Sequence, residues 1–159
     1  MTKHKFNNSI LRAYDIRGIY NQTLFDADAF FVGKAFASFL NKKGKNKMVV
    51  ACDGRYSSPA LKENLIKGLV ESGVEVIDVG LGPTPMLYFS VYHLNCDAGI
   101  MVTGSHNPKD HNGFKMMLSD RPFFGDDILG LAKLLEANDL VEGQGTCEEK
   151  SVQDDYVER

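Results

Sequence analysis

The sequence predicts an α/β fold, a three-layer α/β/α sandwich built on a mixed, mostly parallel sheet. Short apolar runs of strand length alternate along the chain with longer segments whose apolar residues recur at helical spacing. Glycine follows three of the apolar runs, at Gly54, Gly80 and Gly104, and proline follows Ser58 and Thr84 where helices are expected to begin. Strands joined by helices in this order favour parallel pairing, because each helix returns the chain to the same end of the sheet.

Four apolar runs predict the strands, at residues 48–52, 74–79, 98–103 and 113–118. The first three are separated by segments long enough for a helix, so we expect them to pair in parallel. The turn between the last two is too short to hold a helix. We therefore expect residues 113–118 to form the single antiparallel strand.

Four helices are predicted, at residues 27–40, from 58 to a stop at Gly73, at 86–94 and at 126–138. We expect Asp26 to cap the first helix, because its side chain can accept a hydrogen bond from a free N–H of the first turn. Ser58 and Thr84 are expected to cap the next two, each followed by a proline that suits the first helical position.

Length and composition indicate one ordinary globular domain. The chain has 159 residues, of which 43% are hydrophobic and 25% charged. A net charge of −3 gives no general electrostatic reason to expect nucleic acid or an anionic membrane as a partner. No segment approaches the roughly 20 apolar residues of a membrane span, and the first nine residues lack the apolar stretch of a signal peptide. We expect a cytoplasmic protein.

The three cysteines are widely spaced, and no pair has the Cys-x-x-Cys spacing. They indicate neither a disulfide framework nor a zinc site. Charge divides the chain unevenly, since residues 139–159 hold 2 basic and 7 acidic side chains. We therefore expect a domain over residues 1–138, followed by an acidic linker or edge segment over 139–159.

Ligands of open α/β sheets bind at the carboxyl ends of the parallel strands, which places the candidate site in the loops after the apolar runs. The loop over residues 104–113 carries the densest set of reactive groups: Ser105, His106, Asn107 and Lys109, with Lys115 just beyond. Its glycines, Asn107 and Pro108 also suit a plain turn with a solvated Ser105. A histidine metal site is disfavoured, because His106 and His111 share one short turn without regular ligand spacing.

Three motifs in the chain resemble one family. Residues 99–108 (GIMVTGSHNP), followed by 110–115 (DHNGFK), closely resemble the phosphoserine loop of the α-D-phosphohexomutases, especially the bacterial phosphomannomutase/phosphoglucomutase branch. Residues 12–18 (RAYDIRG) and 53–55 (DGR) match two further motifs of that family in order and spacing. The resemblance implies domain I of an enzyme that interconverts hexose 6-phosphate and hexose 1-phosphate of mannose or glucose, through a bisphosphorylated sugar.

The resemblance also implies roles for individual residues. Ser105 would carry the phosphoryl group, and Lys115 would act as general acid and base for the sugar hydroxyl. Arg17 would stabilise charge on the transferring phosphoryl group. His106 would flank the nucleophile, in loop orientation or in proton or phosphate contacts.

Three further residues are expected near the substrate and the phosphate loop by the same resemblance. Asn107 would share the roles of its neighbour His106, and Tyr14 would shape the wall beside Arg17. Arg55 would either contact the phosphate loop or form a structural pair with Asp53.

The family's cofactor is Mg²⁺, and the resemblance implies that the phosphate on Ser105 is one of its ligands. The other ligands are aspartates of a second-domain loop that this sequence does not contain, and glucose 1,6-bisphosphate serves as priming activator. The expected partners are a hexose phosphate and the remaining domains of the same enzyme, toward which residues 139–159 would lead. The chain alone is expected to be a poor mutase. Two alternatives stay open, namely a phosphoglucosamine mutase domain and a truncated, non-catalytic product that binds sugar phosphates or a partner.

Overall fold

The computed structural model describes residues 4–158, which form a six-stranded mixed sheet with the strand order β1-β5-β4-β2-β3-β6. The strands are β1 (Ile16–Ile19), β2 (Lys47–Cys52), β3 (Glu75–Leu81), β4 (Ala98–Val102), β5 (His111–Leu118) and β6 (Thr146–Glu149). The β5 strand runs antiparallel to β4 and to β1, and the other pairs are parallel. The predicted α/β class and the single antiparallel strand are confirmed.

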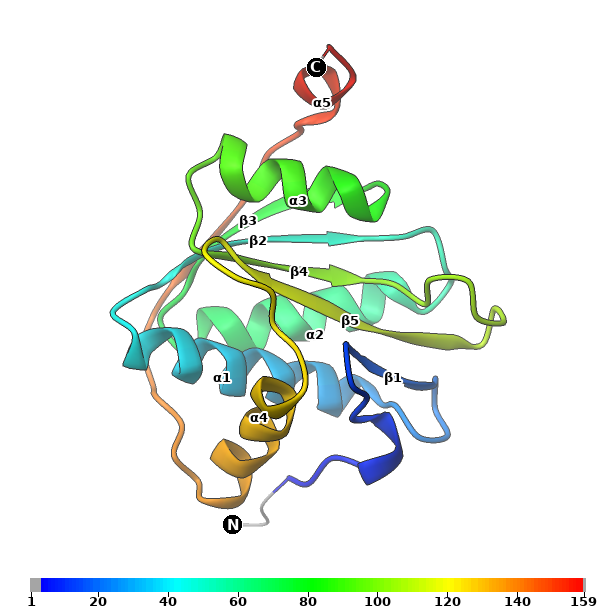
Figure 1. Cartoon of the computed structure of the whole chain (residues 1–159), viewed down its shortest axis with the longest axis vertical. Coiled ribbons are helices and arrows are strands. Elements are labelled where there is room, and N and C mark those ends of the chain that lie inside the picture. The colour runs from blue at the N-terminus through cyan, green and yellow to red at the C-terminus, as the bar shows by residue number, and fades with distance from the viewer. Residues whose placement is uncertain (1–3, 159) are drawn as a thin grey trace.

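Helices cover both faces of the sheet (Figure 1). They are η1 (Asn8–Ile10), α1 (Asp26–Lys42), α2 (Ser58–Val70), α3 (Thr84–His93), α4 (Asp126–Glu136) and α5 (Gln153–Glu158). Figure 1 shows α1, α2 and α4 on one side of the sheet and α3 on the other. The result is the predicted three-layer sandwich.

Two apolar clusters hold the layers together. Met48 and Val50 of β2 face the larger cluster with α1, α2 and α4, and Val49 and Ala51 face the smaller one with α3. All four side chains are fully buried. A strand buried on both faces reads as a continuous apolar run, which is why this strand could be recognised in the sequence.

The predicted helix caps are wrong. Asp26 is the first residue of α1 rather than its cap, and it accepts a hydrogen bond from the Tyr20 hydroxyl at 2.7 Å. Asp28 instead accepts from the Phe25 N–H at 2.7 Å. Ser58 likewise lies inside α2, and its hydroxyl donates to Asp53 rather than to the helix.

Thr84 is also inside its helix, because Pro83 occupies the cap position of α3 and no side chain caps that end. Prolines stand within the first turn of both α2 and α3, as expected, but each of these helices begins at the residue taken for its cap.

The acidic C-terminal segment contributes to the sheet. Thr146 to Glu149 pair in parallel with Glu75 to Asp78 of β3, so β6 is an edge strand. The α5 helix that follows lies against α3, where Tyr156 packs on Phe89 with ring centres 5.6 Å apart. In the stretch 4–158, no helix combines the length and the apolar character that crossing a bilayer requires.

Glycines allow α1 and α2 to pack with their backbones nearly in contact. A Cβ added at Gly68 would lie 2.0 Å from the Phe30 carbonyl oxygen, and one at Gly33 would lie 2.5 Å from the Leu65 carbonyl oxygen. Both distances are too short for any side chain. The separation of the two helices therefore depends on these two positions.

We expect Gly68→Ala to destabilise the protein by about 1–3 kcal/mol, although alanine favours helix, because the added methyl group forces the helices apart. Gly130→Ala is the matched control, since a Cβ at Gly130 in α4 meets no atom within 4 Å. The control should stabilise by up to about 1 kcal/mol. Urea unfolding measures both changes, and equal effects of the two substitutions would contradict this account of the interface.

Candidate functional site

The loops after β2 and β4 meet at the carboxyl ends of these parallel strands. The Asp53 N–H, directly after β2, donates to the Val102 carbonyl oxygen at the end of β4 at 2.9 Å. Between the loops lies a hollow of about 500 Å³, lined by Asp53, Gly54, Arg55, Tyr56, Ser105, Asn107 and Lys109. This is the place where an open α/β sheet binds ligands.

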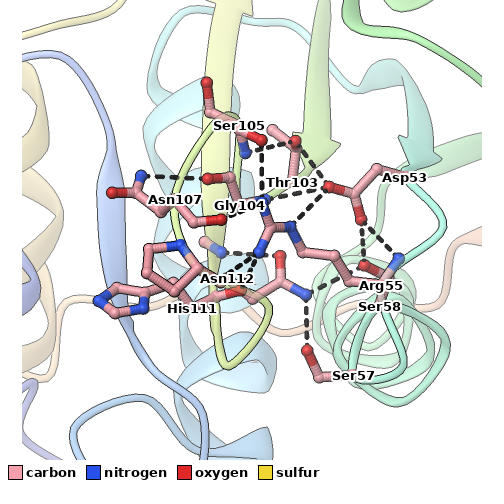
Figure 2. A network of polar contacts seen from close by, with 12 residues as sticks. Asp53, Arg55, Ser57, Ser58, Thr103, Gly104, Ser105, Asn107, His111 and Asn112 are labelled. Atoms are coloured by element: carbon pink, nitrogen blue, oxygen red, sulfur yellow. Dashed lines mark hydrogen bonds and ion pairs between the residues drawn. The ribbon is translucent and has the colours of Figure 1, made fainter.

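The Asp53 carboxylate is the centre of the polar network in this hollow (Figure 2). Its Oδ1 accepts from the Ser58 hydroxyl at 2.6 Å and from the Arg55 N–H at 3.2 Å. Its Oδ2 accepts from the Thr103 hydroxyl at 2.8 Å, the Gly104 N–H at 3.1 Å and Nε of Arg55 at 3.3 Å. Burial alone would raise the pKa of the Asp53 carboxyl, but the donors outweigh it and lower that pKa below its ordinary value.

Arg55 ties Asp53 to the backbone of the loop after β4. Its Nη2 donates to the carbonyl oxygens of Ser105 at 2.9 Å and Asn107 at 2.8 Å, and its Nη1 donates to those of Pro108 and His111. Together with the ion pair to Asp53, these contacts engage the five N–H donors of the guanidinium. The structure thus contains the pair with Asp53 that one of the two sequence interpretations proposed, and it leaves Arg55 no spare donor for a phosphate.

Ser105 is held by its backbone, and its hydroxyl is left free. The Ser105 N–H donates to Oγ1 of Thr103 at 2.9 Å, and its carbonyl oxygen accepts from Arg55. Within the described chain, Oγ of Ser105 has no hydrogen bond, and Figure 2 shows it pointing away from the network. The backbone is left-handed, with φ at +57°, which costs a residue with a side chain about 1–2 kcal/mol. The unfavourable conformation therefore occurs at Ser105, whose hydroxyl is free to act as a nucleophile.

The two residues after Ser105 differ in their surroundings. Asn107 stabilises the turn, because its backbone N–H and its side-chain amide both donate to the Gly104 carbonyl oxygen at 3.1 Å. His106 is exposed, and no other residue from 4 to 158 forms a hydrogen bond or ion pair with it. Of the two, Asn107 therefore has the contacts of a loop-orienting residue.

Lys115 lies on β5, beside β4, and Arg17 lies on β1, beside β5; both are on the α3 side of the sheet. Lys115 pairs with Met101 of β4, whose side chain belongs to the α3 cluster. Ile16 belongs to the larger cluster on the other face of the sheet, and neighbouring side chains of a strand point to opposite faces, so the Arg17 side chain lies on the α3 side. Both side chains are only partly buried, and the Lys115 ammonium has no ion pair with the described residues.

Arg17 is fixed at one end of its guanidinium only. Its Nη2 forms an ion pair with Asp15, while its buried Nε has no hydrogen-bond partner in the described part of the protein. Arg17 pairs with Gly113 of β5, and a Cβ at Gly113 would lie 1.9 Å from the Ile16 carbonyl oxygen. Glycine at this position lets β1 approach β5 closely enough to bring Arg17 to this face.

Tyr14 lies outside the Ser105 hollow. It is 77% exposed and stacks on Phe124 with ring centres 6.0 Å apart. Together with Tyr88, Tyr92 and Met117, these residues line a separate, larger groove of about 780 Å³. Of the residues to which the resemblance assigns roles, Ser105, Asn107 and Arg55 line the hollow, and Lys109 of the candidate loop lines it with them.

No site role was predicted for Thr103 or Asn112, and Ser58 was predicted only as a helix cap. Asn112 is fully buried, and its side-chain amide donates to the hydroxyls of Ser57 at 2.8 Å and Ser58 at 3.0 Å. The available signal was a cluster of short polar residues directly after two apolar runs. Within residues 4–158, no group of three His, Cys, Asp or Glu side chains is arranged to hold a metal ion.

Polar loops that meet at the carboxyl ends of parallel strands, with the Ser105 hydroxyl free, define an α/β domain with a candidate ligand site. The family described as phosphoglucomutase/phosphomannomutase, alpha/beta/alpha domain I, matches residues 8–141. The chain belongs to this family, as the motifs at residues 12–18, 53–55 and 99–115 predict.

Named relatives and a solved structure agree with this membership. The chain is 43% identical to a phosphomannomutase/phosphoglucomutase of Pseudomonas putida over 96% of its length, and 43% identical to a phosphoglucomutase of Neisseria gonorrhoeae over 92%. It covers 33% and 32% of these relatives. A phosphoglucomutase/phosphomannomutase family protein of Burkholderia thailandensis superposes with a TM-score of 0.91 at 43% identity, over 96% of this chain and 35% of that one. The chain thus spans about a third of the length of these relatives.

Because the Ser105 backbone is left-handed, glycine at this position should be more stable than alanine, the reverse of their order in a helix. We expect Ser105→Gly to be more stable than Ser105→Ala by about 1 kcal/mol, because glycine adopts positive φ without steric cost. At the exposed helical position Glu63 of α2, the order should reverse, with Glu63→Gly about 1 kcal/mol less stable than Glu63→Ala. Urea unfolding of the four variants gives both differences, and the same order at the two positions would contradict the assigned conformation.

Proposed function

We propose that this domain carries a phosphoryl group on Ser105 for an intramolecular phosphotransferase that interconverts hexose 6-phosphate and hexose 1-phosphate of mannose or glucose. The observation that supports it best is Ser105 itself, fixed through its backbone with its hydroxyl free. The names of the relatives support the reaction class, and their threefold greater length supports a role for this chain as one part of a longer enzyme.

In the proposed transfer, the bond between Oγ of Ser105 and phosphorus breaks as a sugar hydroxyl oxygen bonds to the same phosphorus. Lys115 would accept the hydroxyl proton as general base and, as general acid, return a proton to the departing Oγ, which leaves as the serine hydroxyl. The reverse step uses the other phosphate of the bisphosphorylated sugar to restore the phosphoserine. Arg17 would offer a guanidinium N–H that is not engaged by Asp15 to an oxygen of the transferring group. The phosphate brings about −1.5 to −2 charges, so nearby cations stabilise the loaded state.

We propose Mg²⁺ as the cofactor, with the phosphate on Ser105 as one ligand and further ligands from another part of a longer polypeptide. The ion would neutralise charge on the transferring phosphoryl group. Glucose 1,6-bisphosphate would load Ser105 at the start. His106, exposed beside the serine, and Asn107 would contact the substrate or its phosphate.

A cytoplasmic location is part of the same proposal. The three cysteines are free thiols, two of them buried and one, Cys147, exposed. An exposed free thiol suits a reducing compartment. Hexose phosphates, as charged metabolites, would meet the protein there.

We expect the 159-residue chain to take up one phosphoryl group on Ser105 when incubated with glucose 1,6-bisphosphate and Mg²⁺, and Ser105→Ala to take up none. Mass spectrometry of the intact chain and its peptides measures the uptake and its position. Phosphate on another residue, or none on the wild-type chain, would contradict the assignment of Ser105. Isomerisation of glucose 1-phosphate by this chain at the rate of a full-length relative would contradict its role as one part of the enzyme.

A further inference from the structure

The Thr103 side chain links the Asp53 carboxylate to the backbone of Ser105. Its side chain is buried, with 6% of the residue exposed, at the end of β4. Its hydroxyl lies 2.8 Å from Oδ2 of Asp53 and 2.9 Å from the N–H of Ser105. The hydroxyl is thus the only side-chain atom that accepts from the Ser105 N–H among the described residues.

The direction of both hydrogen bonds follows from the chemistry of the groups. An ionised carboxylate can only accept, so the single hydroxyl proton of Thr103 points to Asp53. The lone pairs of Oγ1 then face the Ser105 N–H, which can only donate. The low pKa of the Asp53 carboxyl keeps it ionised at neutral pH, and the orientation of the hydroxyl persists with it.

Ser105 needs this support because its backbone conformation is unfavourable by itself. A left-handed residue with a side chain persists only where its surroundings fix it. Here the N–H is held by Thr103 and the carbonyl oxygen by Arg55, and both of these partners bind the same carboxylate, that of Asp53. Neither contact uses Oγ of Ser105.

We infer that Thr103 and Asp53 are positioning residues for the phosphoryl carrier: Asp53 orients the Thr103 hydroxyl, and that hydroxyl fixes the backbone from which Oγ of Ser105 projects. The inference rests on the proposed function where it concerns phosphoryl transfer. The structural part of the inference, that the Thr103 hydroxyl fixes the Ser105 N–H, does not depend on the proposed function.

The first test compares Thr103→Val with Thr103→Ser by amide hydrogen exchange in the 159-residue chain. Valine keeps the shape of threonine without its hydroxyl, and serine keeps the hydroxyl without the methyl group. The Ser105 amide should exchange about tenfold faster in Thr103→Val and at nearly the wild-type rate in Thr103→Ser. The Val50 amide in β2 should keep its protection in both. An unchanged Ser105 amide in Thr103→Val, or equal losses in the two variants, would overturn the inference.

The second test measures phosphate uptake on Ser105 against the concentration of glucose 1,6-bisphosphate. Thr103→Val should lower the maximal rate about tenfold and leave the half-saturating concentration unchanged, because a misplaced nucleophile affects transfer rather than binding. Thr103→Ser should restore the rate. Wild-type uptake by Thr103→Val would overturn the positioning role. A wild-type chain without any uptake would instead contradict the proposed function, and the amide exchange would still decide the structural part.

Discussion

The carboxylate of Asp53 is the interaction on which the rest of the site depends. It stands at the end of a central strand and receives donors from the first turn of α2, from its own loop and from the loop after β4. A partly buried charge is costly unless it is fully hydrogen-bonded, and here five hydrogen bonds satisfy it. Because these donors come from separate segments, their common acceptor fixes the segments relative to one another.

This anchoring leaves one group free. The network uses the backbone of residues 104–108 and the full guanidinium of Arg55, whereas Oγ of Ser105 points away from it (Figure 2). The strand order places Lys115 on β5, beside the strand that leads to Ser105, and Arg17 on β1, the next strand beyond β5. In the proposed function, the fixed backbone of Ser105 would contribute through preorganisation, which is a main source of catalysis in phosphoryl transfer.

The sequence was sufficient to predict the strands and helices that bury a continuous or periodic set of apolar side chains. The strand β2 and the helices α1 and α2 bury continuous or periodic apolar side chains, which the sequence shows directly. The edge strand β6 has four exposed side chains and no apolar period, since its pairing depends on the free edge of β3. The helix caps failed for a related reason, because the Ser58 hydroxyl is engaged by Asp53 from another loop.

The sequence located some site residues but did not predict which contacts their side chains make. Motifs located Ser105 and Lys115, but they could not show whether the donors of Arg55 reach a phosphate or carbonyl oxygens, which depends on where the loop after β4 folds. Tyr14, expected to shape the wall beside Arg17, lines the groove with Tyr88 and Tyr92 rather than the Ser105 hollow. The loop before α4 places it there, since the Gly125 N–H donates to the Ala13 carbonyl oxygen at 2.7 Å and Phe124 stacks on the tyrosine ring.

The most direct measurement of the central claim is the backbone order of residues 104–111 by NMR relaxation, in the wild-type chain and in Arg55→Ala. Arg121→Ala is the control, because the guanidinium of Arg121 bonds to Pro122 and Asp127, both outside this loop. The account predicts order parameters near 0.85 in the wild type and the control, and values below about 0.6 in Arg55→Ala. A loop that stays equally ordered without the Arg55 guanidinium would contradict it.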